Sequence, residues 1–213
     1  MVKKWAGHGQ RDMRLSEHSI RLTGERVVLR PMTENDWDIL MKWNNDADVI
    51  YFSDGENVTG HSLEQVQHIY RSVSQNAFCF IIENDDSPIG ECWLQRMNLQ
   101  RILEKYPRKD CRRIDLMIGA KELWGQGLGT EVISLLTRLG FDTEKADFIF
   151  GCDIADYNPR SLRTFERNGY HIDAKIEQPP GKKAHFAYDL VLSKVDYNKA
   201  IIKNGSQFKE VRR

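Results

Sequence analysis

Three glycines stand within five residues, Gly125, Gly127 and Gly129, where two sequence patterns meet. The segment 112–119 before them is strand-like, and the segment 130–141 after them has apolar residues at helical spacing. A strand that turns through glycines into a helix is typical of an anion site, because the backbone can approach a phosphate and the first N–H groups of the helix point at it. The G-K-[ST] ending of a P-loop and the G-x-G-x-x-G spacing of a dinucleotide site are both missing. Taken alone, the pattern fits a helix start without a ligand equally well.

Strand-like and helix-like segments alternate along the chain. Strands are expected at 26–32, 77–83, 89–95, 112–119, 146–154, 170–177 and 184–194, and helices at 33–45, 61–73, 128–141 and 158–170. Ser62 with Gln65 predicts a capping box on the second helix, and Asn158 with Pro159 predicts the start of the last one. This order predicts a mixed α/β sheet rather than a helix bundle or a β-sandwich.

The length of 213 residues is enough for one well-buried domain. Residues 1–20 are polar and lack periodicity, so they are expected to be a mobile N-terminal arm, followed by a folded domain at 21–197 and a polar tail at 198–213. No apolar run approaches the roughly 20 residues that cross a bilayer, and no signal-like stretch follows the basic start. A soluble, cytoplasmic protein is therefore expected.

Charge and cysteine content exclude several classes of partner. Lysine and arginine number 31, and so do aspartate and glutamate, so no long-range attraction to nucleic acid or to a membrane is expected. Cys79, Cys92, Cys111 and Cys152 lack C-x-x-C spacing. Free thiols and no metal site are therefore predicted.

Two blocks of the sequence carry a family resemblance. "ELWGQGLGTEVISLLTRLGF" (122–141), which follows "RIDLMIG" (113–119), resembles the acetyl-CoA motif Q/R-x-x-G-x-G/A of the GNAT superfamily of N-acetyltransferases. "NPRSLRTFERNGY" (158–170) is similar to the next block of that family, in its order and at its spacing. The resemblance covers residues 26–193. It implies the GNAT fold, one mostly antiparallel sheet of about six to seven strands with about four helices and a splay between strands four and five.

The resemblance also implies acetyl-CoA as the acetyl donor and assigns the residues that would hold it. The pyrophosphate would lie on the glycine turn, the pantetheine arm would pair with the backbone of 117–119, and the second block would face the donor from the other side. The implied residues are Met117, Ile118, Gly119, Trp124, Gly125, Gln126, Gly127, Leu128, Gly129, Thr130, Asn158, Ser161, Phe165 and Arg167. Trp124 stands in the family's Q/R position, so that side-chain contribution is missing. Asn158 is explained equally well as a plain helix cap.

The proton needed in the reaction has no obvious source. Acetyl transfer to an amine requires a neutral amine, an oriented carbonyl and a proton for the leaving thiolate, without a covalent enzyme intermediate. Phe165 stands where many family members place a proton-donating tyrosine. Tyr157 is a candidate substitute, although a packing role is favoured for it, and water or the substrate could also deliver the proton.

Two carboxylates are candidates for catalysis. Asp115 and Asp153 are expected near the carboxyl ends of adjacent strands, where each could accept a proton or hold an ammonium group. The alternative is that Asp115 pairs with Arg112 or Arg113 and that Asp153 caps a turn. The aminoglycoside 6′-N-acetyltransferases look similar at both places, with an Ile-Asp pair in strand four and an Asp five residues before the Asn.

Local charge suggests the acceptor. Between residues 33 and 65, eight acidic residues stand against Lys42 alone, which could attract a polycationic amine, although a solvated helix face also explains acids on a helix. The expected acceptor-binding residues are Asp46, Asp48, Asp54 and Glu56 in a connecting loop, with Tyr51 and Trp93 as the floor of a cleft. Each of these aromatic residues is more often simply core.

These observations predict an acetyl-CoA-dependent N-acetyltransferase that acts on an amine of a cationic small molecule. A 6′-amine of an aminoglycoside, and hence antibiotic resistance, is the best single guess, and a monomer or homodimer is expected. An Nα-acetyltransferase of protein N-termini is an alternative, since its members share the style of "RLTGERVVLRPMTENDW". A non-catalytic acyl-CoA binding module is the other alternative, supported by Phe165.

Overall fold

One eight-stranded sheet organises the part of the chain that the computed structural model describes, residues 13–53 and 60–210. The strands lie in the order β1-β2-β3-β4-β5-β6-β8-β7, and every neighbouring pair is antiparallel except β5 and β6. Their bounds are β1 Leu22–Thr23, β2 Val28–Pro31, β3 Ala77–Asn84, β4 Ser87–Arg96, β5 Cys111–Ile118, β6 Phe148–Ala155, β7 His171–Glu177 and β8 Phe186–Ser193. The predicted mixed, mostly antiparallel sheet is confirmed. The additional strand is β1, which is too short to leave a sequence pattern.

Seven α-helices lie within the described residues, more than the predicted four. They are α1 Trp37–Trp43, α2 Ala47–Ser53, α3 Leu63–Ser74, α4 Gln100–Lys105, α5 Leu128–Arg138, α6 Pro159–Arg167 and α7 Lys194–Glu210, with a 3₁₀ turn η1 at Lys121–Leu123 and a π turn η2 at Leu139–Thr143. The predicted caps of α3 and α6 are both present. No helix among the described residues combines the length and the hydropathy that a bilayer crossing requires.

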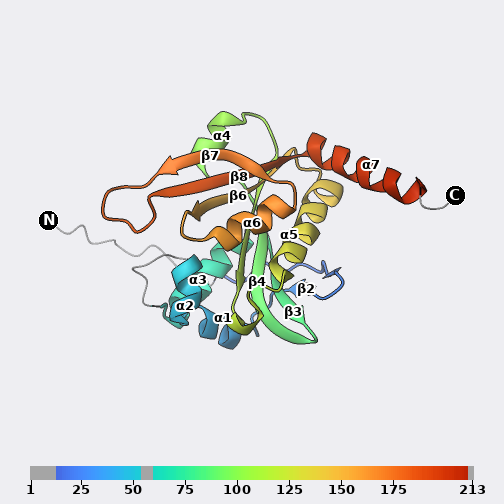
Figure 1. Cartoon of the computed structure of the whole chain (residues 1–213). Helices are drawn as coiled ribbons and strands as arrows, with labels where there is room; N and C mark the ends of the chain where they lie inside the picture. Colours follow the sequence, from blue (N-terminus) through green and yellow to red (C-terminus); the bar gives the residue numbers. More distant parts are fainter. Residues whose placement is uncertain (1–12, 54–59, 211–213) are drawn as a thin grey trace.

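Ordered structure extends beyond both ends of the expected domain at 21–197. Leu15 is buried, its N–H donates to the Glu34 carboxylate (2.8 Å), and the N–H of Ser16 donates to Ser74 Oγ (2.9 Å). The packed part of the chain therefore begins before residue 21. At the other end residues 198–210 of the expected polar tail belong to α7, which projects away from the sheet (Figure 1). Tyr197 fixes the start of α7, because its ring packs 4.8 Å from that of Phe141.

Helices cover both faces of the sheet. Alternate residues of β3 point to opposite faces: Cys79 and Ile81 pack with α1 and α3, whereas Phe80 and Ile82 pack with α5. In Figure 1, α5 and α6 lie in front of the strands and α1 to α3 lie beside them. Because β3 is buried on both faces, its sequence is almost continuously apolar.

The predicted splay lies between β5 and β6, which are the fourth and fifth of the strands predicted from the sequence. These strands pair in parallel only over Cys111–Arg113 and Phe148–Phe150, and no further pairing joins their remaining residues. In Figure 1 the strands β2 to β4 and the strands β6 to β8 consequently form two parts of the sheet that run in different directions. The gap between them opens at the carboxyl end of β5, directly before the glycine turn.

Candidate active site

Gly125 and Gly127 are needed for the conformation of the backbone in the glycine turn, not for close packing. Gly125 has φ 79° and Gly127, the N-cap of α5, has φ 84°, a left-handed region that favours glycine. A Cβ at Gly125 would meet nothing within 4 Å, and one at Gly127 would meet only the Arg26 guanidinium at 3.5 Å. The turn leads directly into α5, whose first N–H groups have no acceptor within the helix. It therefore presents backbone donors and the positive end of a helix dipole.

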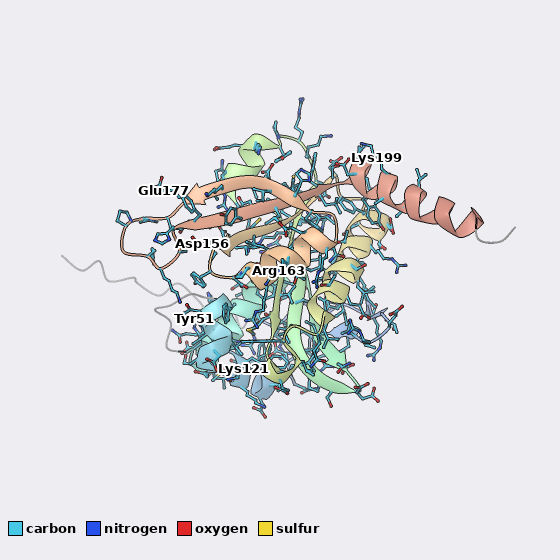
Figure 2. The ribbon with its side chains drawn as sticks, in the orientation of Figure 1. Tyr51, Lys121, Asp156, Arg163, Glu177 and Lys199 are labelled. Atoms are coloured by element: carbon cyan, nitrogen blue, oxygen red, sulfur yellow. The ribbon has the colours of Figure 1, made fainter. Side chains whose placement is uncertain are left out.

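A groove of about 400 Å³ runs from this turn to α6, and we call it the glycine groove. Its wall on α6 carries Arg160, Arg163 and Arg167, spaced three and four residues apart on one helix face. Figure 2 shows Arg163 on this helix. Of these three residues only Arg167 was predicted, although the helical spacing of the basic residues was a usable signal. Three guanidinium groups opposite a helix N-terminus make a site for phosphate groups.

Trp124 replaces the missing polar side chain with a packing surface. The Arg160 guanidinium carbon lies 4.1 Å from the centre of the Trp124 ring and 4.6 Å from that of Phe52. Such stacking holds the guanidinium in place at the groove wall. The Trp124 indole N–H also donates to the carbonyl of Ile118 (2.7 Å).

The free edge of β5 supplies the groove with backbone groups, but not at all of the predicted residues. At the two ends of the β4–β5 ladder, the Met97 N–H donates to Cys111 and the Gly119 N–H donates to Ile89. Odd-numbered residues of β5 therefore pair with β4, and even-numbered ones direct their N–H and C=O groups to the splay. The backbone of Met117 and the N–H of Gly119 thus face β4, while Ile118, as predicted, and Leu116, which was not predicted, face the gap.

Gly119 has a different role from the predicted one. A Cβ at this position would overlap the indole ring of Trp43, which is buried against β5. The glycine is therefore needed for the close approach of α1 to the sheet.

A second hollow of about 740 Å³ lies in the splay, and we call it the splay hollow. It meets the glycine groove at residues that line both, namely Phe52, Leu116, Met117, Asn158 and Ser161. Asn158 caps α6 by accepting the Ser161 N–H (3.2 Å) and donates to the Phe52 carbonyl (3.4 Å). The helix cap therefore also ties α6 to α2 where the two spaces join.

Asp115 lines the splay hollow and is held by two neighbours. Arg113 donates to both of its oxygens (2.5 and 2.8 Å), and the Trp93 indole N–H donates to one of them (2.8 Å). The structure thus contains the ion pair with Arg113 that the sequence left open as the alternative. Both partners also line the hollow. The carboxylate is consequently fixed in orientation at the wall of the hollow.

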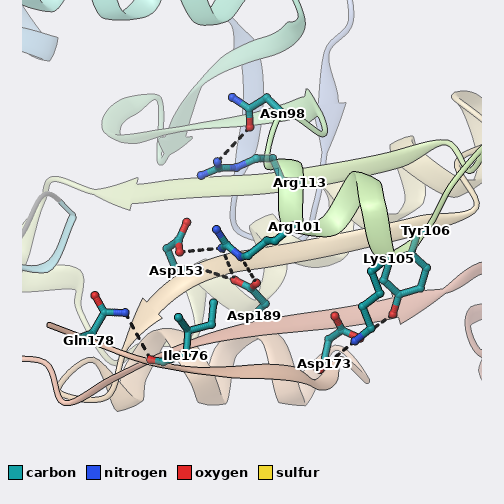
Figure 3. A network of polar contacts seen from close by, with 10 residues as sticks. All are labelled: Asn98, Arg101, Lys105, Tyr106, Arg113, Asp153, Asp173, Ile176, Gln178 and Asp189. Atoms are coloured by element: carbon teal, nitrogen blue, oxygen red, sulfur yellow. Dashed lines mark hydrogen bonds and ion pairs between the residues drawn. The ribbon is translucent and has the colours of Figure 1, made fainter.

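Asp153 also lines the splay hollow, in an unusual backbone conformation. Its φ of 55° lies in the left-handed region, and its N–H donates to Asp189 (3.0 Å), a carboxylate only 1% exposed. Arg101 of α4 binds both carboxylates, at 2.7 Å to Asp153 and at 2.8 and 2.9 Å to Asp189 (Figure 3). The contact with Asp189 raises the pKa of Arg101. An ion-pair cluster, rather than the simple turn cap considered earlier, fixes Asp153.

The segment carrying Arg101 joins the two parts of the sheet. The helix α4 follows β4, yet Lys105 and Tyr106 at its end both bind Asp173 of β7, at 2.7 and 2.6 Å (Figure 3). This connection bridges β4 and β5 to the strands beyond the splay. It helps to set the shape of the hollow from outside.

Four of the eight acids in the predicted acidic segment 33–65 form ion pairs with lysine or arginine. Lys121 of η1 binds Asp46 (2.9 Å) and Asp48 (2.6 Å), and neither carboxylate lines the splay hollow. Asp46 also accepts the N–H groups of Asp48 and Val49 at the start of α2, and its bond to Lys121 lowers its pKa. Both carboxylates are thus held by Lys121 outside the hollow, and their role in acceptor binding stays a prediction. Asp54 and Glu56 lie outside the described residues.

Other acids of the same segment have partners as well. Arg71 binds Glu34 (2.6 Å) and lowers the pKa of that carboxyl to about 2, while Arg30 binds Asp36 (2.7 Å). The charge count along the sequence missed these partners because they come from other elements.

The predicted aromatic residues have different roles. Trp93 and Tyr157 line the splay hollow, and the Tyr51 ring lies 5.3 Å from that of Tyr157. Phe165 is buried between Gly151 and Tyr170, with its ring 5.1 Å from that of the tyrosine, and it also reaches the hollow. Phe165 is thus chiefly a core residue.

Several residues of the splay hollow were missed. Glu91 is a buried carboxylate that interrupts the apolar run of β4, which was a detectable signal. Lys182 and Lys183 come from the β7–β8 loop and had no signal in the sequence. Cys152 lines the hollow as well, and burial raises the pKa of its thiol. A protonated thiol is a poor nucleophile, which agrees with the expected direct transfer.

Fold and site together define an acyltransferase of the kind that the sequence blocks suggested. Residues 26–171 match the family described as the acetyltransferase (GNAT) domain. The chain therefore belongs to the GNAT acetyltransferases, and acetyl-CoA is its acetyl donor.

The chain is also similar to individual proteins and solved structures. The chain is 26% identical to the aminoglycoside N(6′)-acetyltransferase type 1 of Serratia marcescens, over 82% of this chain and 89% of that protein. The corresponding protein of Klebsiella pneumoniae is 25% identical over the same shares. A solved structure of AAC(6′)-Ib with ribostamycin and coenzyme A matches with a TM-score of 0.70 at 23% identity, covering 82% of this chain and 97% of that one. The spermidine N-acetyltransferase of Vibrio cholerae matches with a TM-score of 0.66 at 16% identity, covering 82% and 99%.

Proposed function

We propose that this acetyltransferase transfers the acetyl group directly to a primary amine of a cationic small molecule, and that the 6′-amine of an aminoglycoside is the acceptor to test first. The observation that carries the proposal is the Asp115 carboxylate, oriented by Arg113 and Trp93 at the wall of the splay hollow. The names of the two curated relatives support the choice of acceptor.

The glycine groove fits the donor. The N–H groups at the start of α5 and the guanidinium groups of Arg160, Arg163 and Arg167 would hold its phosphates. The β5 backbone at Leu116 and the N–H of Ile118 would pair with its amide-containing arm, since the Ile118 carbonyl already accepts the Trp124 indole N–H. When bound, acetyl-CoA supplies an activated acyl group as a thioester, and the junction of groove and hollow is where that group meets the amine.

Proton movements are assigned to the splay hollow. In this proposal Asp115 orients the acceptor amine and accepts its proton, directly or through one water molecule. Asp153 holds another ammonium group of the acceptor on the opposite side of the splay. Tyr157 precedes Asn158 at the junction, so its hydroxyl is the candidate donor of a proton to the leaving thiolate.

The experiment is a thiol-release assay with acetyl-CoA and kanamycin, followed by mass analysis of the product. We expect stoichiometric thiol release and one acetyl group at the 6′-amine. Spermidine and a ribosomal-protein N-terminal peptide are tested in parallel. Release with the peptide alone would replace the small-molecule proposal by Nα-acetylation, and no release with any amine would leave a binding module.

A further inference from the structure

Two tyrosine rings from distant parts of the chain face one ammonium group. Tyr51 belongs to α2, where Figure 2 labels it, and Tyr157 follows β6. Their ring centres are 5.3 Å apart, and the planes are inclined by 41°. The Lys183 ammonium nitrogen lies 4.2 Å from the centre of the Tyr51 ring and 5.1 Å from that of Tyr157. Both distances are within the range of a cation–π interaction.

This contact lies at the edge of the splay hollow. Tyr157 and Lys183 line the hollow, and Tyr157 directly precedes Asn158 at its junction with the glycine groove. Lys183 reaches it from the loop between β7 and β8. Lys183 thus places its own ammonium group where an acceptor with several ammonium groups would place one of them.

Backbone hydrogen bonds hold the base of this loop. The Gln178 N–H donates to the His185 carbonyl (2.9 Å), and the His185 N–H donates to the Asp156 carboxylate (3.1 Å). Lys183 is exposed and comes shortly after Gly181, which has φ 90°. Lys183 thus contacts the tyrosine pair from the exposed part of the loop, beyond its hydrogen-bonded base.

We infer that Tyr51 and Tyr157 form a cation subsite of the splay hollow, which Lys183 fills until an ammonium group of the acceptor displaces it. The subsite takes a primary or secondary ammonium group other than the amine that is acetylated. This inference rests on the proposed function, since it adds a second recognition element for a polycationic acceptor. The exchange replaces one cation by another, so the ring of Tyr157, the candidate proton donor, keeps a cation beside it and the main effect is on affinity.

The test is calorimetric binding of kanamycin, and separately of spermidine, to the CoA-saturated protein. Lys183→Met removes the competing ammonium group, and the affinity for at least one polycation should rise about threefold to tenfold. Lys183→Arg keeps a cation and should stay within about twofold of the wild type. Lys182→Met, in the same loop and also lining the hollow, controls for the loss of one positive charge.

The tyrosines are tested in the Lys183→Met background. Adding Tyr51→Leu should abolish the gain in affinity, because the freed subsite is then lost. Equal affinities in wild type and Lys183→Met for both probes, including no measurable binding, would overturn the subsite, and so would an equal gain in Lys182→Met. A gain in affinity without thiol release would overturn the proposed function and keep the subsite. Thiol release without a gain in affinity would keep the proposed function and overturn the subsite.

Discussion

The glycine groove and the splay hollow adjoin each other but are built in opposite ways. The groove uses backbone groups and cations from two short stretches, 116–130 and 158–167. The hollow uses side chains from α3, β4, β5, β6 and the β7–β8 loop, and one of them, Asp153, is oriented by an ion pair to α4. A site made of local backbone geometry leaves a motif in the sequence, whereas a site made of distant side chains leaves none. This difference separates the donor, which the sequence identifies, from the acceptor.

Asp115→Asn should have the largest effect, and only on the hollow. The amide keeps the size of the side chain but cannot accept the amine proton, so kcat should fall about 100-fold while the affinity for CoA stays unchanged. Steady-state kinetics and CoA titration measure both quantities. Asp48→Asn is the matched control, because Asp48 binds Lys121 away from the hollow. Unchanged kcat in Asp115→Asn would reduce Asp115 to a structural partner of Arg113.

Gly127→Val should affect the groove and spare the hollow. The cost comes from forcing a β-branched residue to φ 84°, about 1–2 kcal/mol, so the Kd of CoA should rise about tenfold. Crowding contributes little, because a Cβ there meets only one side-chain atom, at 3.5 Å. Gly129→Ala is the control, since a Cβ at Gly129 makes ordinary contacts of 3.6 and 3.7 Å. Equal CoA affinity in both variants would argue against phosphate binding at this turn.

Arg101→Met tests whether the hollow depends on a remote segment. Loss of the guanidinium frees Asp153 and leaves the buried Asp189 without its cation, so KM for the acceptor should rise about threefold to tenfold and the Tm should fall. The Kd of CoA should not change. Arg101→Lys restores one charge without the bidentate geometry and should recover part of the affinity. A rise in the Kd of CoA equal to that in KM would show that the two spaces are not separable in this way.

The smallest effect is expected outside both spaces, at His18. Its Nε2 lies 2.9 Å from the Cys79 carbonyl and its Nδ1 accepts the Ile20 N–H (3.2 Å), so the neutral ring fits, and burial lowers its pKa below 6.5. The unfolded chain then binds the additional proton first, so stability is full above about pH 6.5 and decreases as the pH falls towards the folded-state pKa. Between about pH 7.5 and pH 5.5, the Tm of the wild type should fall more than that of His18→Gln. The corresponding difference in the free energy of unfolding is about 1 kcal/mol or less. Parallel pH curves would contradict this assignment.

The fold was largely predictable because its signals are local. The strand runs, the capping box of Ser62 and Gln65, and the cap at Asn158 each depend on residues close in sequence. The short helix α2 was missed because seven residues give little periodicity, whereas the segment that contains α4 was expected to be partly helical. The helical tail α7 was missed because its sequence is mostly polar.

The splay hollow was only partly predictable, because its side chains come from segments that are far apart in the chain. Asp115 and Asp153 were found because they interrupt apolar strands at the carboxyl side of the sheet. The ion pairs of Asp46 and Asp48 were not foreseen, because Lys121, which binds both, lies more than 70 residues away in the chain. Charge summed along a segment does not reveal such partners.

The bridging helix α4 has a consequence for how this enzyme can change. The connection between β4 and β5 lies outside the sheet ladder, and surface connections tolerate insertion and replacement better than strands do. Through Arg101 it nevertheless fixes Asp153 at the wall of the splay hollow. Variation confined to residues 97–110 could thus alter which amines are accepted while the glycine turn and α6 stay intact. Acceptor specificity can therefore diverge through substitutions in this connection, while the residues that bind the acetyl donor stay unchanged.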